Sequence, residues 1–323
     1  MTRVRILLLL GVLALIVALV PAASAQETFG LTQEEYDALV NANANSTAAS
    51  SYDYAFTMNL DATASGDGFS MALDGSGAVS DGFSMNVTGT LSAEGESLPA
   101  QLGLVVAGDM LYISLDGGTT WYGGTAEELL GMATGMTGGM LPVDPAALAS
   151  GDLSGLEGQM GDMSGMMTGL EDLDATQFVS ITAAPDGDTT VYTLTLDLAG
   201  LLSTPEMGTL LGTAMLSSGA MGSSTEQPSQ EELAMMGQMM GGMFATATAT
   251  ITQTVDTAAG VVTQTVLNIG IPMDAMGSAG DGVNITFDIS LSNYNAAAPV
   301  EAPASSQPIS GLLSGLMGGM SGM

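Results

Sequence analysis

Apolar and polar residues alternate along much of the chain between residues 52 and 294. The clearest case is the segment YDYAFTMNLD at 52–61, in which every second residue is aromatic or aliphatic. A period of two is typical of a β-strand with one buried and one solvated face. The same alternation predicts ten further strands, at residues 69–73, 83–87, 102–106, 110–115, 119–122, 177–183, 190–198, 244–255, 261–271 and 283–294.

Short turn sequences separate many of these strands. Gly108-Asp109, Asp116-Gly117-Gly118 and the run from Pro185 to Asp188 each stand between two consecutive predicted strands. Tight turns of this kind join antiparallel neighbours. The pentapeptide Asp-Gly-Phe-Ser-Met occurs at 67–71 and again at 81–85, which indicates a repeat of one strand and one turn. We therefore expect an antiparallel sheet.

A helix is predicted at residues 31–44, just before the first strand. Thr32 is a suitable N-cap, and Glu35, three residues later, completes a capping box. Leucine, tyrosine and valine residues give this helix one apolar side. Two later stretches, near 125–174 and 200–243, are instead rich in Met and Gly, and we interpret them as helical insertions with Gly-rich connections. The second holds a helix candidate at 230–243.

These elements predict a mainly β fold. We expect one domain over residues 26–295, built on a large curved antiparallel sheet or half-open barrel of about eleven strands. The N-terminal helix and the Met-rich helices are the available covers for its apolar face. Residues 296–323 are expected to form a Pro/Ala/Ser linker, at 296–308, and an apolar Gly/Met tail.

The first 25 residues predict a signal peptide. Arg3 and Arg5 precede an apolar run from Ile6 to Val20, and the small residues Ala23 and Ala25 mark a cleavage site. The apolar run is shorter than the roughly 20 residues that a spanning helix needs. We therefore expect an exported protein, periplasmic or extracellular, with no stable membrane span after cleavage.

Charge narrows the possible partners. Arg3 and Arg5 are the two basic residues of the chain, so cleavage would leave 34 acidic and no basic side chains. Such a protein forms no side-chain salt bridge and offers nothing that neutralises a phosphate, which argues against nucleic acid and anionic membrane surfaces as partners. The chain also lacks Cys, and with it the lipobox Cys of a bacterial lipoprotein, which favours a soluble product.

Catalytic chemistry finds little support in the composition. The chain has no His and no Cys, and after cleavage no Lys or Arg, so Asp, Glu, Ser, Thr and Tyr are what a catalyst could use. A paired Asp-Thr/Ser-Gly motif, as in aspartic proteases, is missing from the sequence. We expect a non-enzymatic protein without a cofactor.

Methionines recur at helical spacing. Met236, Met239, Met240 and Met243 stand at i, i+3, i+4 and i+7, which places them on one face of a helix. Three interpretations stay open. The methionines fill the core beneath the helices, or they form a pliable lining for a lipid cavity. In the third, their thioethers bind Cu(I), with these four residues as the ligands.

Three passages carry a resemblance to a known fold. The helix at 31–44 leads into a first strand that begins SYDYAF at 51–56. The hairpin segment GDMLYI at 108–113 follows in mid-domain, and GGTTW at 117–121 comes after it. This layout resembles the periplasmic carrier fold of the LolA/LolB proteins and of the mycobacterial LppX/LprG lipid-binding lipoproteins. The resemblance implies a half-open barrel of about eleven antiparallel strands with helices in its mouth.

We therefore expect a binding protein that carries a lipid or another hydrophobic small molecule in the half-barrel. A neutral cargo is favoured over an anionic one. A structural or cell-surface protein without ligand, and a Met-based Cu(I)-binding protein, remain as alternatives. The candidate cavity residues are Tyr54, Phe56, Met58, Phe69, Met71, Phe83, Met85, Met132, Met136, Met163, Met167, Met236, Met240 and Met243.

Overall fold

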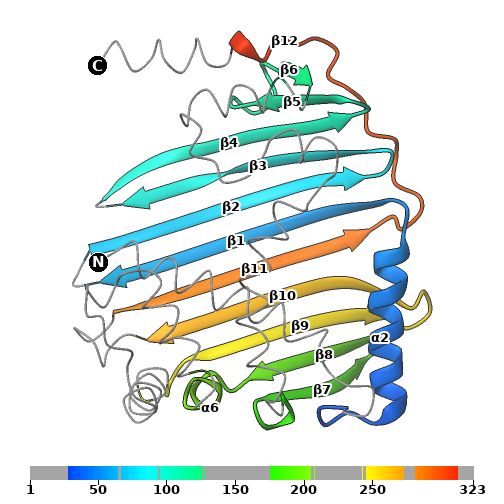
Figure 1. Ribbon diagram of the computed structural model, residues 1–323, viewed down its shortest axis with the longest axis vertical. Coiled ribbons are helices and arrows are strands. Elements are labelled where there is room, and N and C mark those ends of the chain that lie inside the picture. Colours follow the sequence, from blue (N-terminus) through cyan, green and yellow to red (C-terminus); the bar gives the residue numbers. More distant parts are fainter. Residues whose placement is uncertain are drawn as a thin grey trace, which may run out of the picture.

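The fold is seen in a computed structural model that describes residues 28–64, 67–93, 95–125, 128, 175–204, 207, 242, 245–272 and 281–311. Within them, one sheet of twelve strands has the order β12-β6-β5-β4-β3-β2-β1-β11-β10-β9-β8-β7 (Figure 1). The strands are β1 (Tyr52–Ala64), β2 (Asp67–Val79), β3 (Gly82–Ala93), β4 (Glu96–Ala107), β5 (Met110–Ser114), β6 (Tyr122–Thr125), β7 (Val179–Asp186), β8 (Thr189–Leu196), β9 (Thr248–Asp256), β10 (Val261–Pro272), β11 (Gly282–Ser292) and β12 (Gln307–Pro308).

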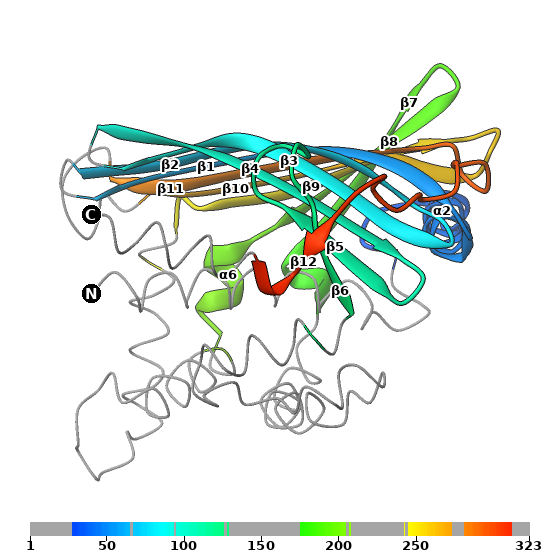
Figure 2. The same ribbon diagram turned by 90° about the horizontal axis from the view of Figure 1, so that it is seen from above.

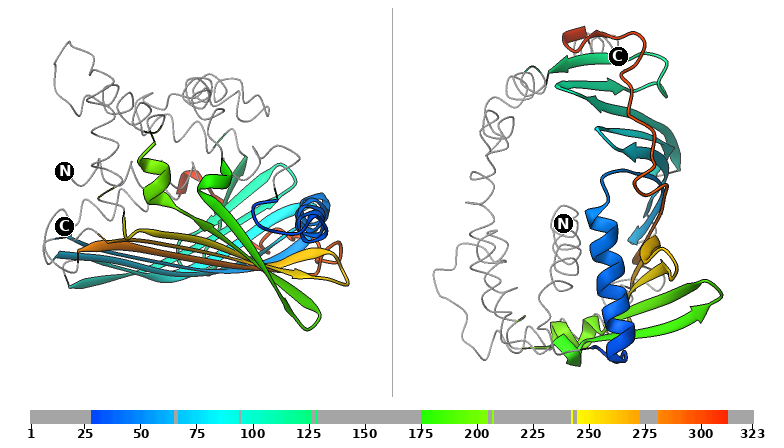
Figure 3. Two further views of the ribbon diagram at one scale, coloured as in Figure 1. Left: turned by 90° about the horizontal axis from the view of Figure 1, so that it is seen from below. Right: turned by 90° about the vertical axis from the view of Figure 1, so that its right-hand side faces the viewer.

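The antiparallel sheet predicted from the alternation is confirmed. Each of the eleven predicted strands overlaps one of β1 to β11, and these pair antiparallel throughout. β12 pairs parallel with β6 and lies in the segment predicted as a linker. The sheet is curved and does not close, which agrees with a half-open barrel (Figure 3).

One strand begins later than predicted. β6 starts at Tyr122 rather than at residue 119, because the preceding turn is longer than a simple hairpin turn. The Ser114 hydroxyl accepts a hydrogen bond from the N–H of Gly118 (2.8 Å), and the Asp116 carboxylate accepts one from the N–H of Thr120 (2.8 Å). These bonds hold the backbone of residues 115–120 in the turn.

In the described part of the chain, two helices lie on the concave side of the sheet, namely α2 (Gln33–Ala48) and the short α6 (Leu198–Leu202) (Figure 3). A 3₁₀ turn, η2, spans Ala175–Gln177. The predicted capping box of α2 is present: the Thr32 hydroxyl accepts from the N–H of Glu35 (3.3 Å), and the Glu35 carboxylate accepts from the N–H of Thr32 (2.9 Å).

α2 covers the part of the sheet formed by β7 to β10. Ala42 of the helix is 1% exposed and belongs to a cluster of buried side chains that includes Tyr192, Val255 and Val262. The C-terminal turn of α2 is fastened by Ser46, whose hydroxyl accepts a hydrogen bond from the N–H of Val262 (2.8 Å). α2 is therefore a fixed part of the core.

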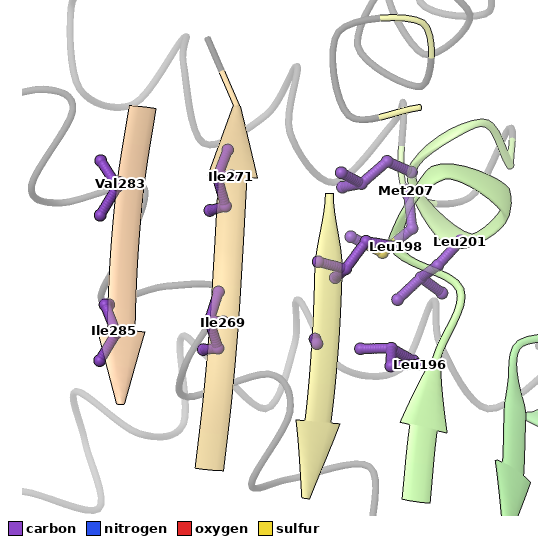
Figure 4. Close-up of a cluster of buried hydrophobic side chains, with 10 residues drawn as sticks. Leu196, Leu198, Leu201, Met207, Ile269, Ile271, Val283 and Ile285 are labelled. Atoms are coloured by element: carbon purple, nitrogen blue, oxygen red, sulfur yellow. The ribbon is translucent and has the colours of Figure 1, made fainter. Parts of the chain in front are cut away.

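α6 covers the neighbouring part of the same face. Its Leu198, Leu201 and Leu202 are each 2% exposed and pack on apolar side chains that rise from the strands. Figure 4 shows Ile269 and Ile271 of β10 on the same side of the sheet as Leu198 and Leu201. The largest buried cluster of the described residues therefore lies between α6 and strands β8 to β11.

Residues 293–311 form what we call the C-terminal strap. It leaves β11 and crosses the ends of the strands to reach the outer edge of β6 (Figures 1 and 2). The N–H of Asn295 donates to the carbonyl of Ser51 (2.7 Å), and the N–H of Val300 donates to the Ser80 hydroxyl (3.1 Å). Further on, the N–H of Ile309 donates to the carbonyl of Gly123 (2.9 Å). Thus residues 296–308 lie against the sheet.

Both outer edges of the sheet meet other parts of the chain. β12 lies beside β6 at one edge. At the other edge, the N–H of Ile181 in β7 donates to the carbonyl of Phe29 (2.8 Å). Pro185, four residues further along β7, has no N–H to offer. Neither edge strand is therefore fully open to another strand.

Several predicted segments lie outside the described residues. These are the signal peptide at 1–25, the tail at 312–323, and nearly all of the insertions near 125–174 and 200–243. The predicted helix at 230–243 falls there too, apart from residue 242. Among the helices of the described part, none has the length and hydropathy to cross a membrane.

Candidate functional site

The concave face of the sheet has two unlike halves. On β8 to β10, side chains such as Leu196, Ala249 and Ile269 are 2–4% exposed beneath α6. On β1, Tyr54 and Phe56 face the same side and are only half-buried. The half formed by β11 and β1 to β4 is thus where large apolar side chains stay partly accessible.

Four aromatic rings form a line across this accessible half, which we call the aromatic floor: Tyr54, Phe56, Phe83 and Phe287. The ring of Tyr54 lies 6.0 Å from that of Phe83 and 6.4 Å from that of Phe56, with interplanar angles of 18° and 15°. Phe56 lies 5.8 Å from Phe287 at an angle of 34°. Ring separations in this range are attractive. The floor therefore runs from β3 over β1 to β11.

The rings lie flat because β2 has glycines beneath them. Gly75 and Gly77 stand opposite Phe56 and Tyr54 in the register of β1 and β2. A Cβ atom at Gly75 would come within 2.2 Å of the Phe56 ring, and one at Gly77 would come within 2.6 Å of the Tyr54 hydroxyl. Any larger residue at these two positions would lift the rings off the sheet.

The polar end of Tyr54 is satisfied. Its hydroxyl donates a hydrogen bond of 2.8 Å to the carbonyl oxygen of Ser84 on β3. Burial, with a smaller contribution from Tyr52, raises the pKa of Tyr54 from 10 to about 12. The phenol is therefore uncharged and fixed in place over a wide pH range, and it adds no charge to the floor.

Methionines and leucines surround the rings. Met58 stands between Phe287 of β11 and Leu73 of β2, and Met85 stands between Gly77 of β2 and Leu104 of β4. Since Met side chains adapt to irregular apolar shapes, these positions give the rigid floor a pliable border.

The structure brings together the candidate residues that lie in the described part. Seven of them share the concave face of three neighbouring strands: Tyr54, Phe56, Met58, Phe69, Met71, Phe83 and Met85. The other seven candidates lie outside the described residues: Met132, Met136, Met163, Met167, Met236, Met240 and Met243. Met239, the remaining residue of the Cu(I) alternative, also lies outside them.

Sequence reasoning missed one member of the floor. Phe287 lies beside Phe56 although it is more than 200 residues away in the chain. The alternation within 283–294 already placed it on the apolar side of its strand. Its position next to β1 follows from the pairing of β1 with β11, which the alternation does not contain.

Charge is scarce on the accessible half of the face. Among the described side chains at concave positions of β1 to β5 and β11, one is charged. It is Glu96, at the tip of the β3–β4 hairpin. Acidic residues such as Asp61, Asp74 and Asp288 alternate with the floor residues and face the convex side. The floor therefore suits uncharged apolar groups.

Two hollows are lined by described residues. One of about 560 Å³ lies beside β6 and β12, where Gly123, Glu128, Gln307 and Ile309 line it. The other, of about 210 Å³, lies at the end of β1 to β3 and includes Phe69 and Ala93. In the described part of the chain, no three residues among Asp and Glu gather as a metal site would require.

Comparisons with known proteins find similarity among solved structures. No family model matches the chain, and no curated protein matches it significantly. Among solved structures, the chain is similar to the crystal structure of LprF from Mycobacterium bovis, at 16% sequence identity and a TM-score of 0.35. The match covers 85% of this chain and 100% of that chain. The description of the fold rests on the strand order and register given above.

Proposed function

We propose that the protein is an exported, non-enzymatic binding protein that holds an uncharged hydrophobic ligand against the aromatic floor. The observation that carries this proposal is the half-burial of Tyr54, Phe56 and Phe83 on a face whose other half is covered by α2 and α6. Full burial of an exposed large apolar side chain gains about 1.5–3 kcal/mol, and a ligand that covers these half-buried ones gains a part of that for each.

The shape of the floor also supports a ligand. Its rings are fixed by Gly75, Gly77 and the hydrogen bond to Ser84, so little side-chain freedom is lost when a ligand covers them. The floor extends over β3, β1 and β11, so an elongated molecule that lies across these strands contacts several rings at once.

The absence of basic residues supports a neutral ligand. Residues 26–323 contain no Lys, Arg or His that could pair with a phosphate or carboxylate head group. The 34 acidic residues add repulsion to any anion that approaches. A neutral lipid or another uncharged hydrophobic molecule meets neither obstacle, and a signal peptide would place the protein where such molecules are carried outside the cytoplasm.

The test uses the chain after residue 25. Nile red, which is uncharged, should bind and gain fluorescence, whereas the anionic probe anilinonaphthalene sulfonate should bind more weakly at low salt. Phe56→Ser should weaken Nile red binding by about tenfold or more, because it removes a ring from the floor. Ala55→Ser is the matched control, since Ala55 is exposed on the convex side of the same strand.

Organic extraction of the purified protein followed by mass spectrometry identifies any ligand that it retains. The proposal fails if neither probe binds and no lipid is extracted. It also fails if Phe56→Ser and Ala55→Ser leave Nile red affinity equally unchanged, because binding would then lie elsewhere.

A further inference from the structure

The two ends of the half-open barrel differ. At the end where β1 begins and β2 finishes, α2 and the C-terminal strap lie across the strands, at the right of Figure 1. The strap is held there by hydrogen bonds from Asn295 to Ser51 and from Val300 to Ser80. That end of the aromatic floor is therefore bordered by ordered backbone.

Exposed apolar side chains mark the opposite end, at the left of Figure 1, where β1 leads into β2 and β3 into β4. Leu98 is 66% exposed and Phe69 is 39% exposed, and both belong to the concave face. These two side chains, on one face of neighbouring hairpins, are available for contact with another apolar surface.

An apolar row crosses the sheet from Leu98 to Leu60, which lies two residues along β1 from Met58 at the border of the floor. In the register of the sheet, Leu60 stands opposite Met71, Met71 opposite Leu91, and Leu91 opposite Leu98. Directly opposed residues on one face are about 4.5–5.5 Å apart, so their side chains touch.

We propose that this end of the sheet is the portal through which the hydrophobic ligand reaches and leaves the aromatic floor, and that it docks on the surface of a zwitterionic lipid bilayer. The inference rests on the proposed function. Phe69 and Leu98 contact the bilayer, and the row from Leu98 to Leu60 gives the ligand continuous apolar contact along its path.

Charge selects the kind of bilayer. Glu96 lies on the concave face two residues from Leu98, and residues 26–323 contain no basic side chain. An anionic membrane surface repels acidic groups and attracts basic ones, so the portal fits a zwitterionic surface.

The experiment measures lipid transfer to and from vesicles. Phosphatidylcholine vesicles that contain a pyrene-labelled diacylglycerol are mixed with the protein lacking residues 1–25, and loss of excimer emission reports uptake. The double variant Phe69→Ser/Leu98→Ser should slow uptake and release alike by about tenfold, and should leave the equilibrium partition unchanged. Val40→Ser is the control, because Val40 is 47% exposed on α2 at the closed end.

Each outcome decides a separate point. Unchanged transfer rates in the double variant overturn the portal, as does a weaker equilibrium partition with no slowing, since the two residues would then belong to the binding surface. Transfer from vesicles rich in phosphatidylglycerol should be slower at low salt and recover at high salt; equal rates at low salt overturn the zwitterionic partner. If the unmodified protein takes up no diacylglycerol and no Nile red, the proposed function itself fails.

Discussion

The hydroxyl of Tyr54 on β1 passes over Gly77 of β2 and donates a hydrogen bond to the carbonyl oxygen of Ser84 on β3. This side chain thus links β1 to β3 across β2. Tyr54→Phe keeps the ring and removes this bond, so it should lower the free energy of unfolding by about 0.5–1.5 kcal/mol. Urea unfolding of both proteins measures the difference. An unchanged midpoint and slope would mean that the bond adds nothing to stability.

The same residue makes stability depend on alkaline pH. The pKa of Tyr54 rises from its ordinary value of 10 to about 12 on folding, because burial disfavours the charged phenolate. Its contribution to stability is therefore complete below pH 10 and is lost as the pH rises through about 12. The melting temperature should fall less steeply across this window in Tyr54→Phe than in the unmodified protein. Parallel curves for the two proteins would contradict this expectation.

The glycines beneath the aromatic floor should not tolerate a methyl group. In Gly77→Ala, the new Cβ would lie 1.8 Å from the carbonyl oxygen of Ser84, so strand or ring must shift. We expect a loss of about 1–3 kcal/mol in the free energy of unfolding. Gly68→Ala is the control on the same strand, because a Cβ there meets nothing within 4 Å. Equal stability of the two variants would show that the rings adjust without cost.

Ser46 joins α2 to the sheet. Its hydroxyl accepts the N–H of Val262 and donates to the carbonyl of Ala42. Val262 is 3% exposed, and Ser46→Ala leaves its N–H without this acceptor. The free energy of unfolding should therefore fall by about 1–3 kcal/mol. Thr47→Ala removes an exposed hydroxyl from the next residue and should cost less. Thermal unfolding of both variants makes the comparison, and a larger loss in Thr47→Ala would refute the role of Ser46.

Local sequence patterns were sufficient for the elements of the fold. The alternation from Tyr52 to Asp61 identified β1 and the residues on its apolar face, because successive side chains of a strand point to opposite sides. The capping box of Thr32 and Glu35 identified the start of α2 for an equally local reason. The candidate residues on β1, β2 and β3 then shared a face because the pairing of these strands preserves their alternation.

The features that local patterns did not predict depend on pairing between strands that are far apart in the sequence or on their register. Nothing in the neighbourhood of Gln307 indicates a strand, and it forms β12 because the strap delivers it to the free edge of β6. The role of Gly75 and Gly77 also depends on register, since only the observed pairing of β1 and β2 puts them beneath Phe56 and Tyr54. A shift of one residue would place Phe56 opposite Ser76 or Asp74 and Tyr54 opposite Ala78 or Ser76, and would turn both rings to the other face.

The occupied edges of the sheet affect how the protein aggregates at high concentration. An open edge strand offers backbone groups that recruit identical strands, which is how cross-β fibres grow. Here the C-terminal strap occupies the edge at β6, while Phe29 and Pro185 limit the edge at β7. At pH values well below 4, where most of the carboxylates are protonated and mutual repulsion is weak, folded molecules should therefore precipitate as amorphous, redissolvable aggregates and not as amyloid.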